Sequence, residues 1–408
     1  MTKFNTSIFS ALLLVSAIVL ASCGSDDDEP VVIPERPQNV EACFTDTIRY
    51  EKEKTTAYNF EYPSTDPYGE PVTLSGTITI GDEVRSTQHA RGLLLYNHYT
   101  VYRADQCPSK GELGAQLFMT GSGLITVSAD YYGFGATEDK QQAYCISGAN
   151  AQASVDALIA AKALLASHGY HSDDVLFNAG YSQGAQTTMA VVRLVAQKYP
   201  DIHLTCTFAG GGSYDIPETY RQFIRSGKTA MPSTVISVLL AYNEYFSLGM
   251  PREAIFREPL LSHIDEWVLS KKYSREQIDR LVASNSISDW CAPELLDTDS
   301  ELSQRLMAAL DRDNLCHGWS PRKDEHIYLF HNSADGAVPV ENTQNLGKFL
   351  REQGVEHLSM RVANYGALFG QPAHETGAIF FVAEALLKVC DILDINIWID
   401  YNRFIELL

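Results

Sequence analysis

The sequence predicts an α/β fold, a mostly parallel sheet flanked by helices, from three features. Short apolar runs alternate with helical patterns along most of the chain, which is typical of parallel βαβ units. A Gly-x-Ser-x-Gly pentapeptide, residues 180–184, lies where one such run changes into a helical pattern. Residues 213–319 carry helix upon helix, which indicates a helical insertion into the alternating series.

The expected elements follow one another in chain order. An N-terminal β meander is expected over about residues 44–80. Apolar runs of strand length then follow at residues 93–96, 124–128, 175–179, 203–209, 326–331 and 357–362. Helical patterns over about residues 151–167 and 185–198 lie between strands and predict right-handed crossovers. A further helical run covers residues 376–390.

Ser182, at the centre of the pentapeptide, is the candidate nucleophile. The apolar run 174–179 before it predicts a buried strand, and residues 185–198 after it have helical spacing. The turn between them is so tight that Gly180 and Gly184 are needed where a Cβ would collide with the neighbouring strand or helix. The alternative is a tight turn in a parallel sheet that carries an ordinary serine.

Asp335 and His374 are the candidate acid and base, because they follow the serine in the order Ser, Asp, His that such a site uses. Asp335 lies in the loop after strand 326–331, at the sheet edge where catalytic groups collect. His374 is expected in the loop directly before the last helical run, whereas His357 lies at the far end of its strand. The alternatives are an Asx turn for Asp335 and a helix-capping or surface histidine for His374.

These roles predict acyl transfer through a covalent intermediate. His374 would take the proton of Ser182, and Asp335 would hold the imidazole and stabilise its protonated form. The oxyanion needs two N–H donors, of which the backbone of Gln183 is one. The second is expected in the loop after strand 93–96, from His98 or Tyr99; the alternative for His98 is a polar loop residue.

The chain resembles the secretory lipases of the lipase A type and their bacterial lipoprotein relatives. The resemblance covers the chain from about residue 55 to its end, and it rests on Ser182, Asp335, His374 and the peptides YPSTDPYGEPV (62–72), SGT (75–77), HYT (98–100), CPS (107–109) and ADYYGFG (129–135). It implies an α/β-hydrolase with a helical cap, here about residues 213–319, acting on carboxylic esters. Tyr99 stands where relatives often carry glycine.

The N-terminus predicts an exported lipoprotein. Lys3 precedes an apolar run, residues 8–20, that is too short to span a bilayer and is typical of a signal peptide, here residues 1–22. Cys23 after Leu-Ala-Ser resembles a lipidated first residue, which would anchor the chain to a membrane. Residues 23–40 form an acidic, proline-containing tether before a single domain, residues 41–408.

The acidic run at residues 26–29 resembles an export tag. The expected location is therefore the outer membrane and cell surface of a Gram-negative bacterium. The alternative for the acidic run is a solvated tether without a targeting role.

Composition excludes several function classes. The formal net charge of −20 disfavours nucleic acid and anionic lipid surfaces as partners. Neither a zinc-binding pattern nor a phosphate-binding loop is present, so no metal and no cofactor is expected. Besides Cys23 the chain has seven cysteines, for which Cys107–Cys145 and Cys291–Cys316 are candidate disulfides.

The sequence therefore predicts a serine hydrolase that cleaves a small-molecule, glycan or lipid carboxylic ester. The alternatives are a serine peptidase of the same fold and a non-catalytic surface-binding lipoprotein on a hydrolase scaffold.

Overall fold

The structure of the protein is a computed structural model, and it describes residues 43–52, 55–111, 120–368 and 370–395. The expected signal peptide, residues 1–22, and the tether, residues 23–40, with Cys23, lie outside the described residues. No helix in these described ranges is long and apolar enough to cross a membrane.

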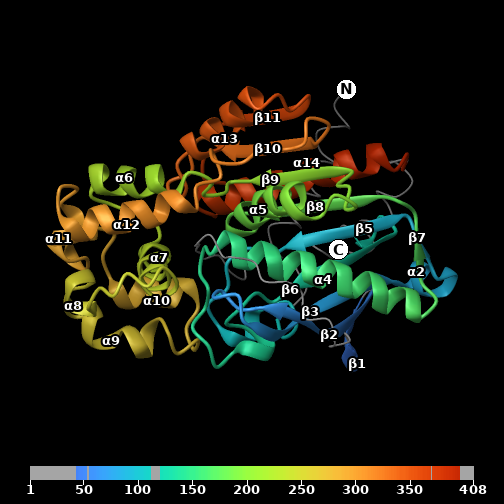
Figure 1. Cartoon of the computed structure of the whole chain (residues 1–408), viewed down its shortest axis with the longest axis horizontal. Coiled ribbons are helices and arrows are strands. Elements are labelled where there is room, and N and C mark those ends of the chain that lie inside the picture. Colours follow the sequence, from blue (N-terminus) through green and yellow to red (C-terminus); the bar gives the residue numbers. More distant parts are fainter. Residues whose placement is uncertain (1–42, 53–54, 112–119, 369, 396–408) are drawn as a thin grey trace.

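A nine-stranded sheet forms the centre of the molecule, in the order β1-β2-β3-β6-β5-β8-β9-β10-β11 (Figure 1). The first three strands form the expected meander and pair antiparallel: β1 Cys43–Lys52, β2 Thr55–Thr65 and β3 Pro71–Gly81. The other six are parallel to one another: β5 Gly92–Asn97, β6 Leu124–Ala129, β8 Leu176–Tyr181, β9 Cys206–Gly210, β10 His326–Asn332 and β11 His357–Ala363. The predicted α/β fold with a mostly parallel sheet is confirmed.

The predicted strand 203–209 begins three residues late, at Cys206. The residues before it leave helix α5, Gln183–Lys198, through a turn, which the Ile202 N–H closes by donating to the Tyr199 carbonyl at 3.0 Å. The apolar run therefore overstates the length of this strand.

Helices cover both faces of the sheet. Along β5, Leu93 and Leu95 join one apolar cluster while Leu94 and Tyr96 join the other, as the two-residue period of a strand requires. Helices α4 Ser147–Ser167, α5 Gln183–Lys198 and α13 Glu341–Glu352 pack into the first cluster, and α14 Ala373–Ile392 packs into the second.

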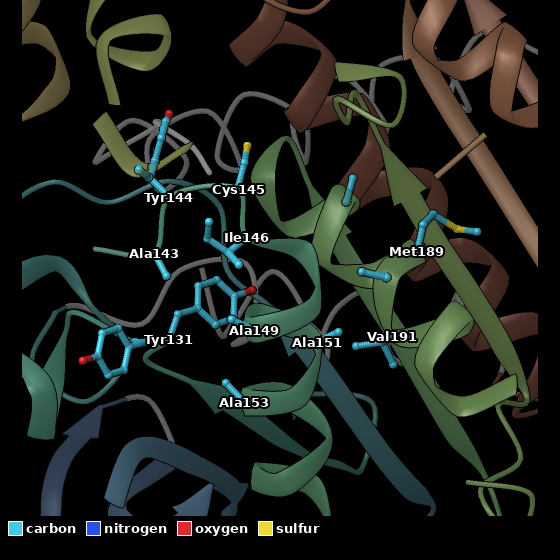
Figure 2. Packing of buried hydrophobic residues seen from close by; sticks show 14 of the residues in the cluster. Tyr131, Ala143, Tyr144, Cys145, Ile146, Ala149, Ala151, Ala153, Met189 and Val191 are labelled. Atoms are coloured by element: carbon cyan, nitrogen blue, oxygen red, sulfur yellow. The ribbon is translucent and has the colours of Figure 1, made fainter. Parts of the chain in front are cut away.

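Small side chains let α4 and α5 pack closely against each other. Ala149, Ala151 and Ala153 of α4 are buried, and Figure 2 shows Ala151 beside Val191 of α5. Alanine has high helix propensity and leaves the backbones free to approach. The two helices therefore sit firmly on the sheet, on the side that carries the serine turn.

Residues 213–319, which the structure describes without a gap, connect β9 to β10 and lie together at one side of the sheet (Figure 1). Their helices are α6 Ile216–Ser226, α7 Pro232–Tyr245, α8 Arg252–Ile255, α9 Leu260–Trp267, α10 Arg275–Val282, α11 Pro293–Leu296 and α12 Glu301–Arg312. Buried aromatic side chains such as Tyr220, Tyr242 and Trp290 pack between these helices.

Short elements near β5 complete the described chain. Helix α2, Asp82–Thr87, precedes a small second sheet in which β4 His89–Ala90 pairs parallel with β7 His171–Ser172. Sequence patterns of two to six residues carry too little periodicity to predict them.

Both candidate disulfides are wrong, because Cys107, Cys145, Cys291 and Cys316 are all present as thiols. Cys107 packs in a small cluster with Val101 and Phe134, whereas Cys145 belongs to the main core. The thiol of Cys291 is directed to the Ala292 carbonyl at 3.7 Å. Cys316 packs against the same main core as Cys291, but the two remain separate thiols.

Candidate active site

Ser182 lies on the turn that joins β8 to α5. Its backbone has φ 59° and ψ −123°, a conformation that residues other than glycine rarely adopt. The Ser182 N–H donates to the Gly210 carbonyl of β9 at 2.8 Å, which holds the strained turn in place. Such strain concentrates at functional sites.

The two glycines of the pentapeptide are required by close backbone approaches. A Cβ on Gly180 would lie 2.3 Å from the Gly184 carbonyl oxygen, and one on Gly184 would lie 2.1 Å from the Asn97 carbonyl oxygen. The serine turn therefore packs directly against the end of β5, and the loop that follows β5 lies beside the serine.

The structure brings Ser182, His374 and Asp335 together. His374 Nε2 lies 2.9 Å from Ser182 Oγ, and His374 Nδ1 lies 2.6 Å from Asp335 Oδ2. The sequence predicts His374 in a loop before the last helix, and this is wrong in detail. His374 lies in the first turn of α14, because the helix begins at Ala373, directly after Pro372. His357 is exposed at the opposite end of β11.

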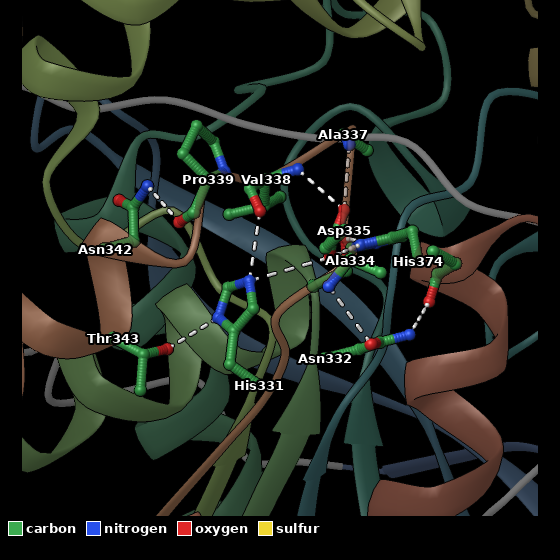
Figure 3. A network of polar contacts seen from close by, with 12 residues as sticks. His331, Asn332, Ala334, Asp335, Ala337, Val338, Pro339, Asn342, Thr343 and His374 are labelled. Carbon is green, nitrogen blue, oxygen red and sulfur yellow. Dashed lines mark hydrogen bonds and ion pairs between the residues drawn. The ribbon is translucent and has the colours of Figure 1, made fainter. Parts of the chain in front are cut away.

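The carboxylate of Asp335 is completely buried, and each of its oxygens has partners (Figure 3). Oδ1 accepts hydrogen bonds from the backbone N–H groups of Ala337 at 2.8 Å and Val338 at 3.0 Å. Oδ2 faces His374. The contacts of the alternative, an Asx turn, are therefore present, and they leave the other oxygen directed at the imidazole.

His331, one strand residue from the acid loop, is a second buried imidazole near Asp335 (Figure 3). Its Nε2 lies 3.0 Å from the Val338 carbonyl, which only accepts, so Nε2 carries the proton and Nδ1 accepts from the Thr343 hydroxyl at 2.7 Å. Burial lowers the pKa of His331. This neutral ring fixes the loop that carries the acid.

Asn332 connects the acid loop to the helix that carries the base (Figure 3). Its Oδ1 accepts from the N–H groups of Ala334 at 3.2 Å and Tyr365 at 3.0 Å. Its Nδ2 donates to the carbonyls of Gly366 at 3.0 Å and Ala373 at 2.7 Å. One buried side chain therefore sets the distance between Asp335 and the first turn of α14.

Tyr181, which precedes the serine, holds the base from the other side. Its hydroxyl donates to the His374 carbonyl at 2.8 Å, and its ring packs against Phe381 of α14. The position of His374 is thus fixed by β8 and by β10 together.

Electrostatics favour a charged pair between acid and base. Burial raises the pKa of Asp335, but His374, His331 and the Val338 N–H outweigh burial, and the pKa lies below its ordinary value. Burial lowers the pKa of His374, but the Asp335 carboxylate outweighs burial, and the pKa lies above its ordinary value. Each shift is what a hydrogen-bonded carboxylate–imidazole pair produces.

Ser182 and His374 open into a cavity of about 60 Å³. Helices α6 and α7 form one wall of this cavity, and its side chains are mostly apolar, although Thr219 and Thr234 also line it. The apolar residues of this wall are Ile216, Tyr220, Phe223, Met231, Val235 and Val238, and the cavity is also lined by Thr100, Cys145, Gln183 and Gln186.

The loop after β5 presents Thr100, not its neighbours, to this cavity. The His98 ring stacks on Tyr131 with 4.1 Å between centroids. Its Nδ1 and Nε2 lie 2.5 and 3.3 Å from the carbonyls of Tyr99 and Asp130. Both ring nitrogens of His98 therefore face backbone carbonyls of the protein.

Two basic residues before and within α10 fasten residues 213–319 to the rest of the molecule. The Lys271 ammonium donates to the carbonyls of Gly133, Glu138 and Lys140, and burial lowers its pKa to about 8. Arg275 pairs at 2.9 Å with Glu375, the residue after His374.

Sequence reasoning missed Asn332, His331 and Tyr181. Asn332 and His331 directly precede the acid loop, and a polar pair at the buried end of an apolar strand was the available signal. Among the described residues, no group of three His, Cys, Asp or Glu side chains is arranged to hold a metal ion.

No family model and no curated protein sequence matches the chain. Solved structures do. The rice cell wall degrading esterase LipA from Xanthomonas oryzae superposes with a TM-score of 0.70 at 22% identity, over 83% of this chain and 90% of LipA. A proposed hydrolase from Legionella pneumophila superposes with a TM-score of 0.70 at 20% identity, over 86% and 90%.

Candida antarctica lipase A is more distant, with a TM-score of 0.54 at 15% identity over 77% of this chain and 72% of the lipase. The superpositions show a shared fold, and at identities of 15 to 22% they show the fold alone. The protein therefore has the α/β-hydrolase fold, with its pentapeptide serine at the strand-to-helix turn.

Proposed function

We propose that the protein is a serine hydrolase that cleaves carboxylic esters through an acyl-enzyme intermediate. The observation that carries the proposal is the hydrogen-bonded series Ser182, His374 and Asp335, placed on a strained turn at one end of a cavity. The fold shared with an esterase and a lipase supports it.

In the proposed reaction His374 Nε2 accepts the Ser182 proton while the serine oxygen attacks the ester carbonyl. Asp335 keeps the proton on His374 Nδ1 and stabilises the imidazolium. The N–H of Gln183, the first residue of α5, has no acceptor within the helix and stabilises the oxyanion, because a helix N-terminus carries positive partial charge. The alcohol leaves with the His374 proton, and water then cleaves the acyl-enzyme in the same way.

The cavity favours an ester with a small apolar acyl group. Its volume of about 60 Å³ is modest, and the α6 and α7 side chains on its wall offer no charge to a polar acyl substituent. We propose that residues 213–319 act as a cap, because their helices α6 and α7 form this wall.

A panel of p-nitrophenyl esters of increasing acyl length tests the function. We expect hydrolysis that is fastest for short chains, and Ser182→Ala should lower it by at least about a thousandfold with no loss of folding. Turnover of no ester, or a Ser182→Ala variant that keeps a hundredth of the activity, contradicts the proposal. The first result would favour a non-catalytic binding lipoprotein.

We also propose that Cys23 anchors the exported protein to a membrane. Cys23→Ser should move the protein from the membrane fraction to an unprocessed or soluble form, because the acyl chains on this cysteine provide the attachment. Replacement of Asp26, Asp27, Asp28 and Glu29 by alanine should leave it membrane-bound but protected from protease added to whole cells. If this variant and wild type are equally sensitive to protease, the export-tag role is contradicted, but the lipid anchor at Cys23 is not.

A further inference from the structure

Three buried polar atoms around the cavity have no hydrogen-bond partner among the described residues. They are Thr100 Oγ1, Gln183 Oε1 and Gln186 Nε2, and their residues are 0%, 5% and 1% exposed. All three residues line the cavity that contains Ser182. Other described residues also keep unpaired buried polar atoms, but these three share the cavity that contains Ser182, where a polar group of a ligand can pair with them.

Thr100 lines the same cavity as Ser182, and the backbone just before it packs against the serine turn. A Cβ on Gly184 would lie 2.1 Å from the Asn97 carbonyl oxygen and 2.9 Å from the His98 carbonyl oxygen. The backbone just before Thr100 therefore touches the serine turn. Thr100 thus follows, by two residues, the segment that touches the serine turn. Its hydroxyl is a donor that can rotate toward an acceptor in the cavity.

We propose that the Thr100 hydroxyl donates the second hydrogen bond to the oxyanion, opposite the backbone N–H of Gln183. The proposal rests on the ester hydrolase function argued above. It assigns to a side chain of this loop the role first expected of His98 or Tyr99.

The reaction gives this hydroxyl a defined part. As the bond forms between Ser182 Oγ and the ester carbon, the carbonyl electron pair moves onto oxygen and the serine proton moves to His374. Thr100 keeps its own proton and donates a hydrogen bond to the new oxyanion. When the carbonyl re-forms, the alcohol leaves with the proton from His374, and Thr100 is unchanged.

The His98 ring and the Gln186 side chain are less well placed as donors. Both ring nitrogens of His98 face backbone carbonyls, at 2.5 and 3.3 Å. Gln186 lies four residues beyond Ser182, about one helical turn of 5.4 Å into α5, whereas an oxyanion is bound at the helix N-terminus.

The test compares Thr100→Val with Thr100→Ser on a short p-nitrophenyl ester. Valine has the same shape without the donor, so kcat should fall by about 100-fold with KM changed less than about twofold. Serine keeps the hydroxyl, and kcat should stay within about fivefold of wild type. The matched control is Thr207→Val, because Thr207 on β9 is also completely buried with an unpartnered hydroxyl but does not line the cavity.

A structural role is separated by two further measurements. Thr100→Val should melt no lower than wild type, since it removes an unpaired buried hydroxyl. A boronic acid, which forms a tetrahedral adduct with the serine, should bind the valine variant at least about tenfold more weakly, while a simple alcohol product binds equally. A valine variant with kcat and boronate affinity within threefold of wild type overturns the assignment. If Thr100→Val is unchanged in this way but Ser182→Ala loses its activity, only the role of Thr100 is overturned, and the proposed hydrolase function is retained.

Discussion

The two sides of Ser182 are built differently. On the acid–base side, Asp335, His331 and Asn332 are buried and hydrogen-bonded at 2.6 to 3.2 Å within one network. On the side proposed to bind the oxyanion, Thr100, Gln183 and Gln186 each keep a buried polar atom without a partner among the described residues.

This difference follows from what each side must do. The acid and base act on a proton already present in the free enzyme, so their geometry is best fixed before substrate binds. An oxyanion exists only during the reaction, so its donors must be free in the resting enzyme. In this cavity, the partnered polar atoms belong to groups that the protein positions, and we propose that the unpartnered atom of Thr100 is completed by the oxyanion.

The largest effect should come from the acid–base pair itself. His374→Ala and Asp335→Asn should each lower kcat by about a thousandfold or more with little change in KM, because both groups act on the chemical step. Kinetics with a short p-nitrophenyl ester measure this. The control is His357→Ala, at the exposed end of β11, and an equal loss there would contradict the assignment.

An intermediate effect is expected from Asn332, which touches neither substrate nor serine. In Asn332→Asp the carbonyls of Gly366 and Ala373 lose their donors, which should destabilise the fold by about 3 kcal/mol. Because Ala373 precedes His374, kcat should also fall by about 10-fold to 100-fold.

Urea unfolding and steady-state kinetics measure the two effects of Asn332→Asp. Asn364→Asp is the control, since Asn364 is exposed and its side chain accepts a hydrogen bond from the nearby Gly366 N–H at 3.0 Å. A wild-type kcat in Asn332→Asp would show that the network does not position the base.

The sequence predicts the partnered side better than the unpartnered one. Strand ends, glycines and the order Ser, Asp, His follow from local patterns, and these placed Ser182, Asp335 and His374 at one sheet edge. Local patterns do not predict which side chain of the loop after β5 faces the cavity. The course of the loop decides this, and it turns Thr100, not His98, toward the cavity. The contacts of Arg275 with Glu375 join residues 100 positions apart, and no local pattern records them.

The smallest effect concerns the charges that flank the base. Ester hydrolysis requires neutral His374, so kcat/KM falls as pH drops through the pKa of this ring. The Glu375 carboxylate raises that pKa and the Arg275 guanidinium lowers it, both more weakly than Asp335 acts. Glu375→Gln should therefore move the acidic limb of the pH profile to lower pH, and Arg275→Met should move it to higher pH. Shifts in the same direction would mean that the two variants act by displacing α10 and the cap rather than by charge at His374.

The double variant Arg275→Met with Glu375→Gln separates these two causes, because the pair also joins α10 to α14 at 2.9 Å. A pH profile like that of wild type would show that the two charges had balanced each other at His374.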